Sequence, residues 1–277
     1  MAVGSPTAQA PATPIGFRRD AARLTPGQLA IIRRAFRAVQ GLGDDRGYAH
    51  HSGIHGLPLP IGCDNAHGTE YFLPWHRAYL YFFERALRDR EPDAMLPWWD
   101  WRVGLGRPAE LPPPFAEPND ELGPNPLFDA EVSPLALQQG GNAVPPRTRR
   151  RAGHPAAPPL PSAAEVVDVL SIRDFTGFSE QIEGLHDRVH MWVGGHMGQI
   201  PYAAFDPIFW AHHCMIDRLW RVWQLEHPGA TPPAAILDEA LPPFRMTVRQ
   251  TLSVTELGYD YAVSTASAPA TPTPVPA

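Results

Sequence analysis

Histidine clustering is the sequence feature that most constrains how this chain can fold. Ten of the 12 histidines fall into two groups more than a hundred residues apart. Imidazole is the commonest protein ligand for metal ions, so a fold that joins the two groups would create a metal site. The first group comprises His50, His51, His55, His67 and His76, and the second comprises His186, His190, His196, His212 and His213.

In the second group, His186 and His190 are four residues apart. On a helix this spacing puts both rings on one face, where they can bind one metal ion. Adjacent residues of a helix point about 100° apart, so only one of His212 and His213 can face the same ion. We assign His213 to the ligand set, which leaves His212 buried or behind the ligands.

The first group supplies His67 and His76, which are nine residues apart and cannot share one helical face. A third ligand then comes from His50, His51 or His55. Two sites of three histidines, built by two pairs of helices, form a dinuclear all-imidazole centre in a four-helix bundle. Imidazole suits copper, zinc, iron and nickel, and the lack of carboxylate ligands disfavours magnesium, calcium and manganese.

Two other metal sites compete with this interpretation. A di-iron carboxylate bundle needs a Glu-x-x-His pair from each of two helices, and the sequence has one such pair, Glu183 and His186. A zinc protease of the His-Glu-x-x-His type needs a motif that the sequence lacks. The all-histidine centre is therefore favoured.

Apolar residues at helical spacing predict a mainly α fold with a few short strands. Two of the helices carry start signals. Thr25 and Pro26 fit the N-cap and first position of one helix, and Asp206 and Pro207 fit those of another. The expected helices cover residues 24–40, 72–89, 178–193 and 206–226, while 41–66 is typical of an ordered loop and 247–261 of a strand or two.

Proline shapes the domain organisation, because 34 of the 277 residues are proline, more than twice the usual ~5%. We expect disorder at 1–16 and 264–277 and one domain over 17–263. Within this domain, 104–161 is a long Pro-rich loop that makes an excursion over the core. The basic run Arg147–Arg151 in this loop is interpreted as solvated, rather than as a protease site or a patch for an acidic partner.

Composition excludes several classes of protein. The net charge is −6, from 23 basic and 29 acidic residues, which argues against a nucleic-acid binder. No run of about 18 apolar residues occurs, so no membrane span is expected. The two cysteines, Cys63 and Cys214, cannot form a disulfide framework.

Two longer motifs surround the histidines. The first, from His67 to Glu84, is His-x4-Phe-Leu-Pro-Trp-His-Arg-x2-Leu-x3-Glu, and the second, from Asp206 to Asp217, is Asp-Pro-x-Phe-Trp-x2-His-x3-Asp. They resemble the two copper-binding signatures of the tyrosinase family, in its bacterial type. The resemblance extends from about residue 17 to 262, and it includes Gly53-Ile-His55-Gly56, Leu96-Pro-Trp-Trp-Asp100 and Leu185-His186-x3-His190-x-Trp-Val-Gly-Gly195.

The resemblance implies a type-3 centre in which two copper ions bind dioxygen between them. Copper A would be held by His55, His67 and His76, and copper B by His186, His190 and His213. Family members oxidise phenols or catechols to o-quinones, so we expect a tyrosinase or polyphenol oxidase. The alternatives are an o-diphenol or o-aminophenol oxidase with little monophenol hydroxylation and, from another class, a reversible dioxygen-binding protein.

Each ligand also needs an acceptor for its second ring nitrogen, which fixes the tautomer. Asp217, Glu84 and backbone carbonyls are the candidates. For Asp217 and Arg77 the favoured interpretation is a structural ion pair.

Four further positions bear on the substrate, and two of them are expected catalytic residues. Glu183 aligns with a glutamate that holds a water near the phenol in members that hydroxylate monophenols. Asp187 stands where such members often carry asparagine, and it can orient that water, act as a base or bind an amine. Met191 and Ile200 correspond to positions beside copper B, so we expect them to line the substrate pocket.

The resemblance also implies partners. A small phenol and dioxygen are the expected substrates, and some bacterial relatives receive copper from a small helper protein. The sequence shows no signal peptide of its own, so we expect a cytoplasmic protein or one exported with such a helper. Cys63 lies four residues before His67, which differs from the spacing of relatives with a Cys–His thioether, so a free thiol is expected.

Overall fold

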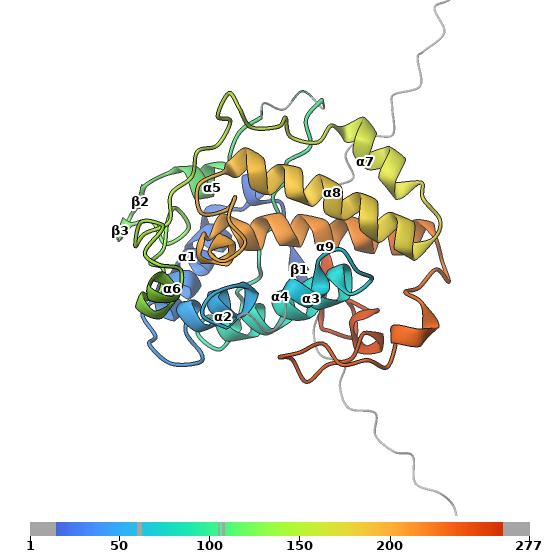
Figure 1. Cartoon of the computed structure of the whole chain (residues 1–277). Helices are drawn as coiled ribbons and strands as arrows, with labels where there is room; N and C mark the ends of the chain where they lie inside the picture. The colour runs from blue at the N-terminus through green and yellow to red at the C-terminus, as the bar shows by residue number, and fades with distance from the viewer. Residues whose placement is uncertain (1–14, 60–62, 105, 107–108, 263–277) are drawn as a thin grey trace, which may run out of the picture.

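The computed structural model describes residues 15–59, 63–104, 106 and 109–262, which form a mainly helical structure (Figure 1). The disorder expected at residues 1–14 and at 264–277 lies outside these ranges, whereas Gly16 belongs to a strand. The helices are α1 (Pro26–Gln40), α2 (Tyr48–His55), α3 (Cys63–Ala66), α4 (Phe72–Arg88), α5 (Pro113–Ala116), α6 (Pro134–Gln139), α7 (Ala163–Leu170), α8 (Phe175–Val193) and α9 (Ile208–Glu226). The strands are β1 (Gly16–Arg18), β2 (Asn119–Asp120), β3 (Gly123–Pro124) and β4 (Tyr259–Tyr261).

Helix α1 begins where its sequence predicts. Thr25 Oγ1 accepts a hydrogen bond from Gln28 N–H at 3.3 Å, and Gln28 Oε1 accepts one from Thr25 N–H at 3.0 Å. This reciprocal pair is a capping box, which satisfies backbone donors that the first turn leaves free. Phe36 then contacts Phe83 of α4 with ring centroids 5.5 Å apart, so the buried face of α1 packs on α4.

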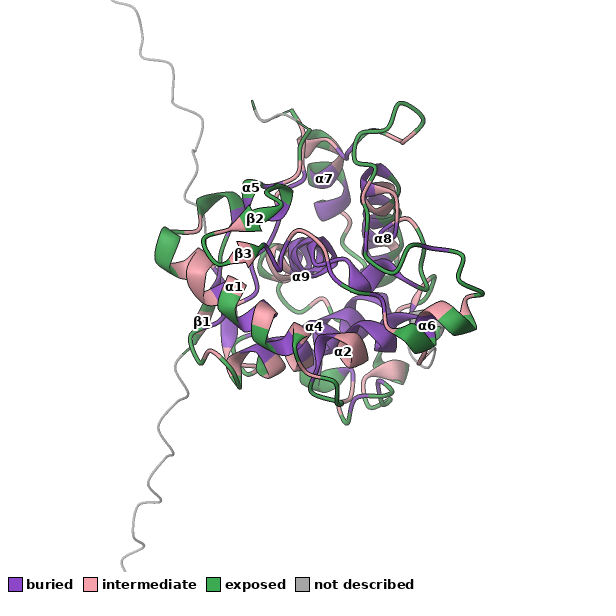
Figure 2. Ribbon diagram, turned by 90° about the vertical axis from the view of Figure 1, so that its left-hand side faces the viewer, coloured by how far each residue is buried: buried purple, intermediate pink, exposed green. Residues whose placement is uncertain are grey.

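The centre of the molecule is built from long helices. α8 and α9 lie side by side, and α4 packs against α9 (Figure 1). Phe83 of α4 stacks on Trp210 of α9 with ring centroids 3.7 Å apart, and both side chains are buried. Figure 2 shows α9 at the centre, buried along most of its visible length. Side chains on α2, α4, α8 and α9 can therefore meet inside the molecule.

The segment 41–66 is not the expected loop, because it contains α2 and α3. Helix α2 has weak local signals: Gly47 stands at its N-cap without a capping side chain, and Gly53 lies inside it. Packing against the short 3-10 turn Ala203–Phe205 holds α2 instead. Tertiary contacts therefore determine this helix, and its sequence pattern does not reveal it.

Helix α9 begins at Ile208, one residue after the predicted start. Asp206 still accepts a hydrogen bond from Ile208 N–H, at 3.2 Å. Its buried carboxylate also accepts hydrogen bonds from Arg150 Nε, which lies 2.9 Å from each carboxylate oxygen. The interpretation of the basic run as solvated is therefore wrong for Arg150, which is an internal ion-pair partner.

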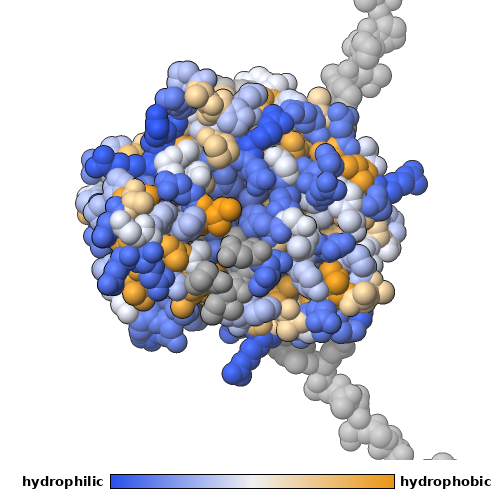
Figure 3. Space-filling model, in the orientation of Figure 1, coloured by the Kyte–Doolittle hydropathy of each residue, from blue (hydrophilic) through white to orange (hydrophobic). Residues whose placement is uncertain are grey.

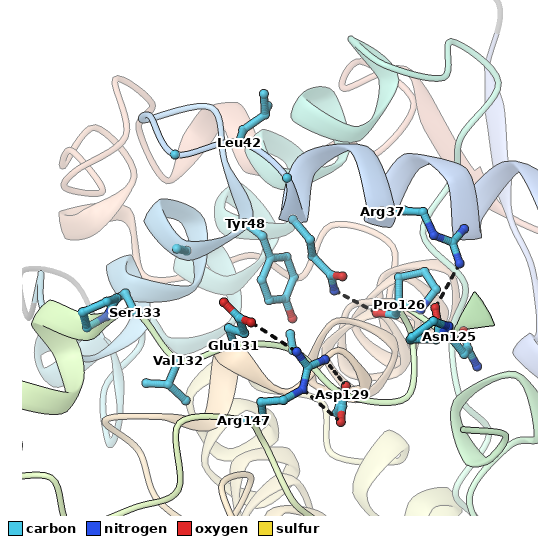
Figure 4. Close-up of a pocket in the computed structure, with 17 residues that line it drawn as sticks. Arg37, Leu42, Tyr48, Asn125, Pro126, Asp129, Glu131, Val132, Ser133 and Arg147 are labelled. Carbon is cyan, nitrogen blue, oxygen red and sulfur yellow. Dashed lines mark hydrogen bonds and ion pairs between the residues drawn. The ribbon is translucent and has the colours of Figure 1, made fainter. Parts of the chain in front are cut away.

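The Pro-rich segment 104–161 is ordered by short elements and ion pairs. It contains α5, α6 and an antiparallel pair, β2 and β3. Arg147 is half exposed and pairs with Asp129 and Glu131, and these side chains line a cavity of about 650 Å³ beside α1 (Figure 4). Internal contacts therefore fix the course of this segment.

Strands β1 and β4 pair in parallel and bring the two ends of the described chain together. The strand expected within 247–261 is therefore present. Arg18 of β1 is buried and binds Glu84 of α4 at 3.0 Å and Asp217 of α9 at 3.1 Å. Arg77 of α4 also pairs with Asp217. One ion-pair network thus ties β1, α4 and α9 together, and the expected Arg77–Asp217 pair is confirmed.

The face shown in Figure 3 is mostly hydrophilic, and its hydrophobic residues form small separate groups. Such scatter is normal for protein surfaces and needs no partner to explain it. Among the helices of the described ranges, none has the length and apolar character needed to cross a membrane.

Candidate metal centre

The structure brings the six predicted ligands together from five segments of the chain. Their ring nitrogens form two groups, in each of which the nitrogens lie within 4.8 Å of one another. The first group is His55 at the end of α2, His67 before α4 and His76 on α4, and the second is His186 and His190 on α8 with His213 on α9. A ring nitrogen of His212, also on α9, lies within the same distance of the second group but is not among the predicted ligands. Helix spacing places His186 and His190 on one face, as expected.

Backbone carbonyls fix the rings of three of these histidines. In each, Nδ1 lies within hydrogen-bond distance of a carbonyl oxygen, so the proton sits on Nδ1 and Nε2 keeps its lone pair. The pairs are His76 with Phe72 at 2.8 Å, His190 with Met197 at 2.7 Å and His55 with Ile200 at 3.3 Å.

Carboxylates fix two more rings. His67 Nδ1 donates to Glu183 Oε1 at 2.8 Å, and Gly68 N–H donates to both oxygens of the same carboxylate, at 2.9 and 3.1 Å. His186 Nδ1 donates to Asp187 Oδ1 at 3.0 Å. The two expected catalytic carboxylates therefore also orient one histidine of each group.

The Nε2 atoms point where a metal ion would lie. His213 Nε2 is 3.3 Å from Nε2 of His186 and 3.3 Å from Nε2 of His190. Two histidine nitrogens bound at ~2.0–2.1 Å with near-tetrahedral angles are about 3.3 Å apart. In the first group, Nε2 of His67 and of His76 is buried without a hydrogen-bond partner among the described residues. Buried polar atoms rarely lack a partner, and a metal ion would supply it.

Burial favours the uncharged form of five of the six ligand rings. Desolvation, with a smaller contribution from neighbouring imidazoles, lowers the pKa of His55, His76, His186 and His213 well below the ordinary 6.5. Desolvation also lowers the pKa of His190 to about 4. Metal binding requires the neutral imidazole, so these ligands need release no proton to bind a metal ion at neutral pH.

The two groups adjoin. The rings of His76 and His213 stack with centroids 4.4 Å apart and an angle of 17° between their planes. Ligand atoms of His67, His186 and Asp187 also lie within 4.8 Å of one another. The arrangement is therefore a single site with room for two metal ions rather than two separate sites.

The remaining histidines of the two clusters have other surroundings. Of the three residues left open for the first group, the structure groups His55 with the other ligands, while His51 packs against Phe83 with ring centroids 5.5 Å apart. His212 is buried, as expected, and stacks on His186 at 5.0 Å. His196 uses both ring nitrogens in hydrogen bonds to the backbone.

A cavity of about 350 Å³ opens over both groups. Imidazoles of both groups line it, together with Asp187, Met191 and Ile200. Met191 and Ile200 are 55% and 54% exposed, so they stand at its rim. The two expected pocket positions do face the histidines, although both are more open to solvent than a closed pocket would make them.

Glu84 and Asp217 do not hold histidine rings, because their carboxylates bind Arg18 and Arg77. The acceptors for five of the six ligands are instead backbone carbonyls and the carboxylates of Glu183 and Asp187, while Nδ1 of His213 has no hydrogen-bond partner among the described residues. No sequence pattern could single out the carbonyls of Met197 and Ile200, since every residue has one. The side chain of Cys63 lies outside the described residues, so the expected free thiol stays a prediction.

Comparisons with known proteins agree with this geometry. Residues 45–226 match the common central domain of tyrosinase. A tyrosinase of Streptomyces lincolnensis is 37% identical over 211 residues, which cover 66% of this chain and 76% of the relative. Unit D of a Helix pomatia haemocyanin is 30% identical over 228 residues, covering 75% of this chain and 51% of the relative.

Solved structures show the same fold. A functional unit of octopus haemocyanin superposes with a TM-score of 0.72 and 27% identity, covering 89% of this chain and 68% of that one. A copper-depleted Aspergillus oryzae tyrosinase mutant, complexed with L-tyrosine, superposes with a TM-score of 0.75 and 18% identity, covering 94% and 95%.

A helical core that joins two three-imidazole groups at one open cavity defines a dinuclear metalloprotein of the type-3 class. The chain belongs to the tyrosinase family. Its cofactors are accordingly two copper ions, which act with dioxygen, and its histidine groups fit them.

Proposed function

We propose that this protein is an oxidase that uses dioxygen to convert phenols and catechols to o-quinones. His55, His67 and His76 hold one copper, and His186, His190 and His213 hold the other. One observation carries the proposal: the cavity over the histidines reaches rings of both groups from the surface. Its ~350 Å³ falls in the range of small-molecule sites, so a single-ring phenol can reach both metal positions.

The bound copper pair supplies the oxidising chemistry by binding dioxygen. The protein side chains determine how a phenol enters. Met191 and Ile200 provide apolar contacts at the rim for the aromatic ring. The cavity is lined by one carboxylate, from Asp187, and by no arginine or lysine among the described residues. A ring with a neutral or cationic substituent therefore fits better than one with a carboxylate.

Proton transfer falls to Asp187 in this proposal. Both oxygens of Glu183 already accept hydrogen bonds from Gly68, and one also accepts from His67. Asp187 uses one oxygen for His186, while its side chain is 65% exposed. Burial and the nearby Glu183 raise the pKa of Asp187 in the metal-free protein, and its exposed carboxylate can accept a proton at the cavity. A phenol has a pKa near ~10, so such a base helps it to bind as the phenolate.

The close alternative is an o-diphenol or o-aminophenol oxidase with little monophenol hydroxylation. The Asp187 carboxylate supports it, because an amino group on the ring can donate a hydrogen bond to that carboxylate at the cavity. A reversible dioxygen-binding protein is the alternative from another class, and the similarity to haemocyanin units of Helix pomatia and octopus supports it. The open cavity favours an oxidase, since a carrier must keep phenols away from its copper.

Three substrates with the same ring substituent separate these functions: p-cresol, 4-methylcatechol and 2-amino-4-methylphenol. Initial rates are measured with protein that holds two coppers per chain. A tyrosinase oxidises the first two, whereas the close alternative oxidises only the last two. If none of the three is oxidised, the proposed activity is wrong. A helper protein for copper loading belongs to the same proposal, and it predicts that co-expression raises the copper content.

A further inference from the structure

His196 belongs to the second histidine cluster but not to either ligand group. Its ring is 2% exposed and both nitrogens are occupied: Nδ1 accepts from Arg149 N–H at 3.0 Å, and Nε2 donates to the Pro145 carbonyl at 3.0 Å. The tautomer is thus the reverse of that in the carbonyl-bound ligands, which carry the proton on Nδ1. A ring with both nitrogens used in this way has no lone pair left for a metal.

His196 lies in a turn of residues 194–201, called the ligand turn below. The turn approaches the segment 145–150 of the Pro-rich excursion very closely. His196 N–H donates to the Arg149 carbonyl at 3.0 Å. Gly195 has a φ of +61°, and a Cβ atom there would lie 1.9 Å from the Arg149 oxygen. Only glycine permits this contact.

The same turn holds one ligand of each metal group. The carbonyl of Met197 accepts from His190 Nδ1 at 2.7 Å, and the carbonyl of Ile200 lies 3.3 Å from His55 Nδ1. The far end of the turn also meets α2, because Leu57 N–H donates to the Pro201 carbonyl at 3.1 Å. A shift of the ligand turn would therefore rotate His190 and His55 together.

The segment 145–150 is itself anchored on its other side. Thr148 N–H donates to the Ala130 carbonyl at 2.9 Å, and Thr148 Oγ1 accepts from Ala130 N–H at 3.0 Å. Arg150 is locked to the buried Asp206 just before α9. Arg147 reaches from this segment toward the acidic side chains of the cavity beside α1 (Figure 4). The segment is thus a fixed support against which His196 holds the ligand turn.

We infer that His196 is a positioning residue for both copper sites and acts through the carbonyls of Met197 and Ile200. Its two hydrogen bonds keep the ligand turn on the segment 145–150, and the turn keeps His190 and His55 in the orientation that metal binding needs. Loss of these bonds weakens one ligand of each copper at once. The inference rests on the copper assignment of the proposed function, but not on the oxidation of any substrate.

The test compares His196→Leu with His196→Gln and with a control, His227→Leu. His227 is also a histidine that donates from Nε2 to a carbonyl, that of Leu170 at 2.8 Å, but Leu170 belongs to α7 rather than to the metal centre. Each protein is loaded with two equivalents of copper and dialysed against a chelator. Copper per chain is measured over time. Two further readouts are the near-ultraviolet band that the copper protein gains on addition of hydrogen peroxide and the melting temperature of the metal-free form.

Copper is expected to leave His196→Leu on the order of tenfold faster than wild type, the size of effect usual for groups that orient ligands, and its band weakens. His196→Gln keeps a donor for the Pro145 carbonyl, so its rate of copper loss should lie between those of wild type and His196→Leu. His227→Leu should melt at lower temperature yet keep wild-type copper retention and spectrum. If His196→Leu does not fold, His196→Asn replaces it, since its shorter amide cannot make both bonds.

Wild-type copper retention in the folded Leu or Asn variant would overturn the inference. The same holds if His227→Leu loses copper equally fast, because the effect would then reflect stability alone. Loss from one site only, with the second copper held at the wild-type rate, also contradicts a turn that serves both sites. A wild type that holds two coppers but oxidises no phenol would refute the proposed function and leave this inference standing.

Discussion

Each copper site has only three histidine ligands, and each ligand contributes one nitrogen. No single ligand is therefore dispensable. We predict that His76→Ala and His213→Ala each lower catechol oxidation more than the ~10–100-fold that loss of an orienting partner costs. His55→Ala should behave likewise. His51→Ala is the matched control, because His51 lies on the same helix but packs against Phe83.

Initial rates with copper-loaded variants measure these effects, and copper per chain reports the cause. The expected copper content is below two for the three ligand variants and two for His51→Ala. Near-normal oxidation by His76→Ala or His213→Ala would show that the ligand assignment is wrong at that position. A loss in His51→Ala equal to that in His55→Ala would leave the third ligand of copper A unassigned.

The free oxygen of Asp187 leads to a second prediction. Asp187→Asn keeps the shape of the side chain but removes its basicity, and a positioned base typically contributes ~10²–10⁴-fold. We expect turnover of p-cresol to fall about 100-fold or more and turnover of 4-methylcatechol to fall much less. The reason is that the catechol meets the copper site as a chelating reductant and depends less on an external base.

Glu180→Gln provides the control, since Glu180 is an exposed acid on the same helix, and all three substrates should keep their rates. Equal losses on p-cresol, 4-methylcatechol and 2-amino-4-methylphenol in Asp187→Asn would mean that Asp187 only orients His186. A selective loss on the aminophenol would instead identify the carboxylate as an amine anchor.

At the scale of elements, Asp217 is where β1, α4 and β4 all meet α9. Its buried carboxylate binds Arg18 and Arg77 and accepts from Tyr259 Oη at 2.7 Å. Burial alone would raise its pKa, but the two guanidinium groups outweigh burial and lower it. Removing one partner of a buried ion pair costs ~3–5 kcal/mol, so Asp217→Ala should lower the free energy of unfolding by about that amount.

Urea denaturation of the metal-free protein measures this loss. The matched control is Asp260→Ala, which removes an Asp–Arg pair between β4 and α9, with Arg221 of α9. That pair is about a quarter exposed, so its loss should cost about 1 kcal/mol. Similar losses in the two variants would contradict the central role of the Asp217 network.

Long periodic elements could be predicted from sequence, and context-dependent ones could not. Helices α1, α4, α8 and α9 have apolar residues at helical spacing, and their bounds lie within three residues of the predicted ones. Helix α2 has neither apolar residues at clear helical spacing nor a capping side chain. It could not be predicted because tertiary packing, rather than local sequence, holds it. Helix α7 does have a capping box, Ser162 with Glu165. The segment before it is Pro-rich, so the sequence pattern is interpreted as a loop that continues up to this helix.

The metal centre shows the same division. The spacing of His186 and His190 is a local property of one helix, and the sequence reveals it. The choice of His55 over His51 depended on resemblance, because only the tertiary course of α2 decides which ring reaches His67. The carbonyl of Met197 and the contacts of His196 depend on how two distant segments meet, which residue types do not encode.

For the whole molecule, a cluster of neutral histidines makes the metal-free protein sensitive to acid. An unfolded histidine has a pKa near ~6.5, whereas burial lowers the pKa of His190 to about 4 and moves His55, His76, His186 and His213 in the same direction. The unfolded state therefore binds more protons below pH ~6.5, so stability is complete above that pH and is lost as the pH falls toward 4.

Each such histidine contributes up to about 1.4 kcal/mol per pH unit, so the free energy of unfolding should fall by more than that between pH 6 and pH 5. Urea denaturation of metal-free protein at pH 7.5, 6 and 5 measures it. A stability that does not change across this range would contradict a buried neutral cluster.

Dioxygen consumption in a closed cell is the most direct test of the central claim, that this copper protein oxidises phenols. Protein holding two coppers per chain is mixed with 4-methylcatechol, and dissolved dioxygen and o-quinone are followed together. We predict continued uptake of many dioxygen molecules per chain, with two quinones formed and two waters released for each. Uptake that stops at one dioxygen per chain, yields no quinone and reverses under vacuum would contradict the account and identify a dioxygen carrier.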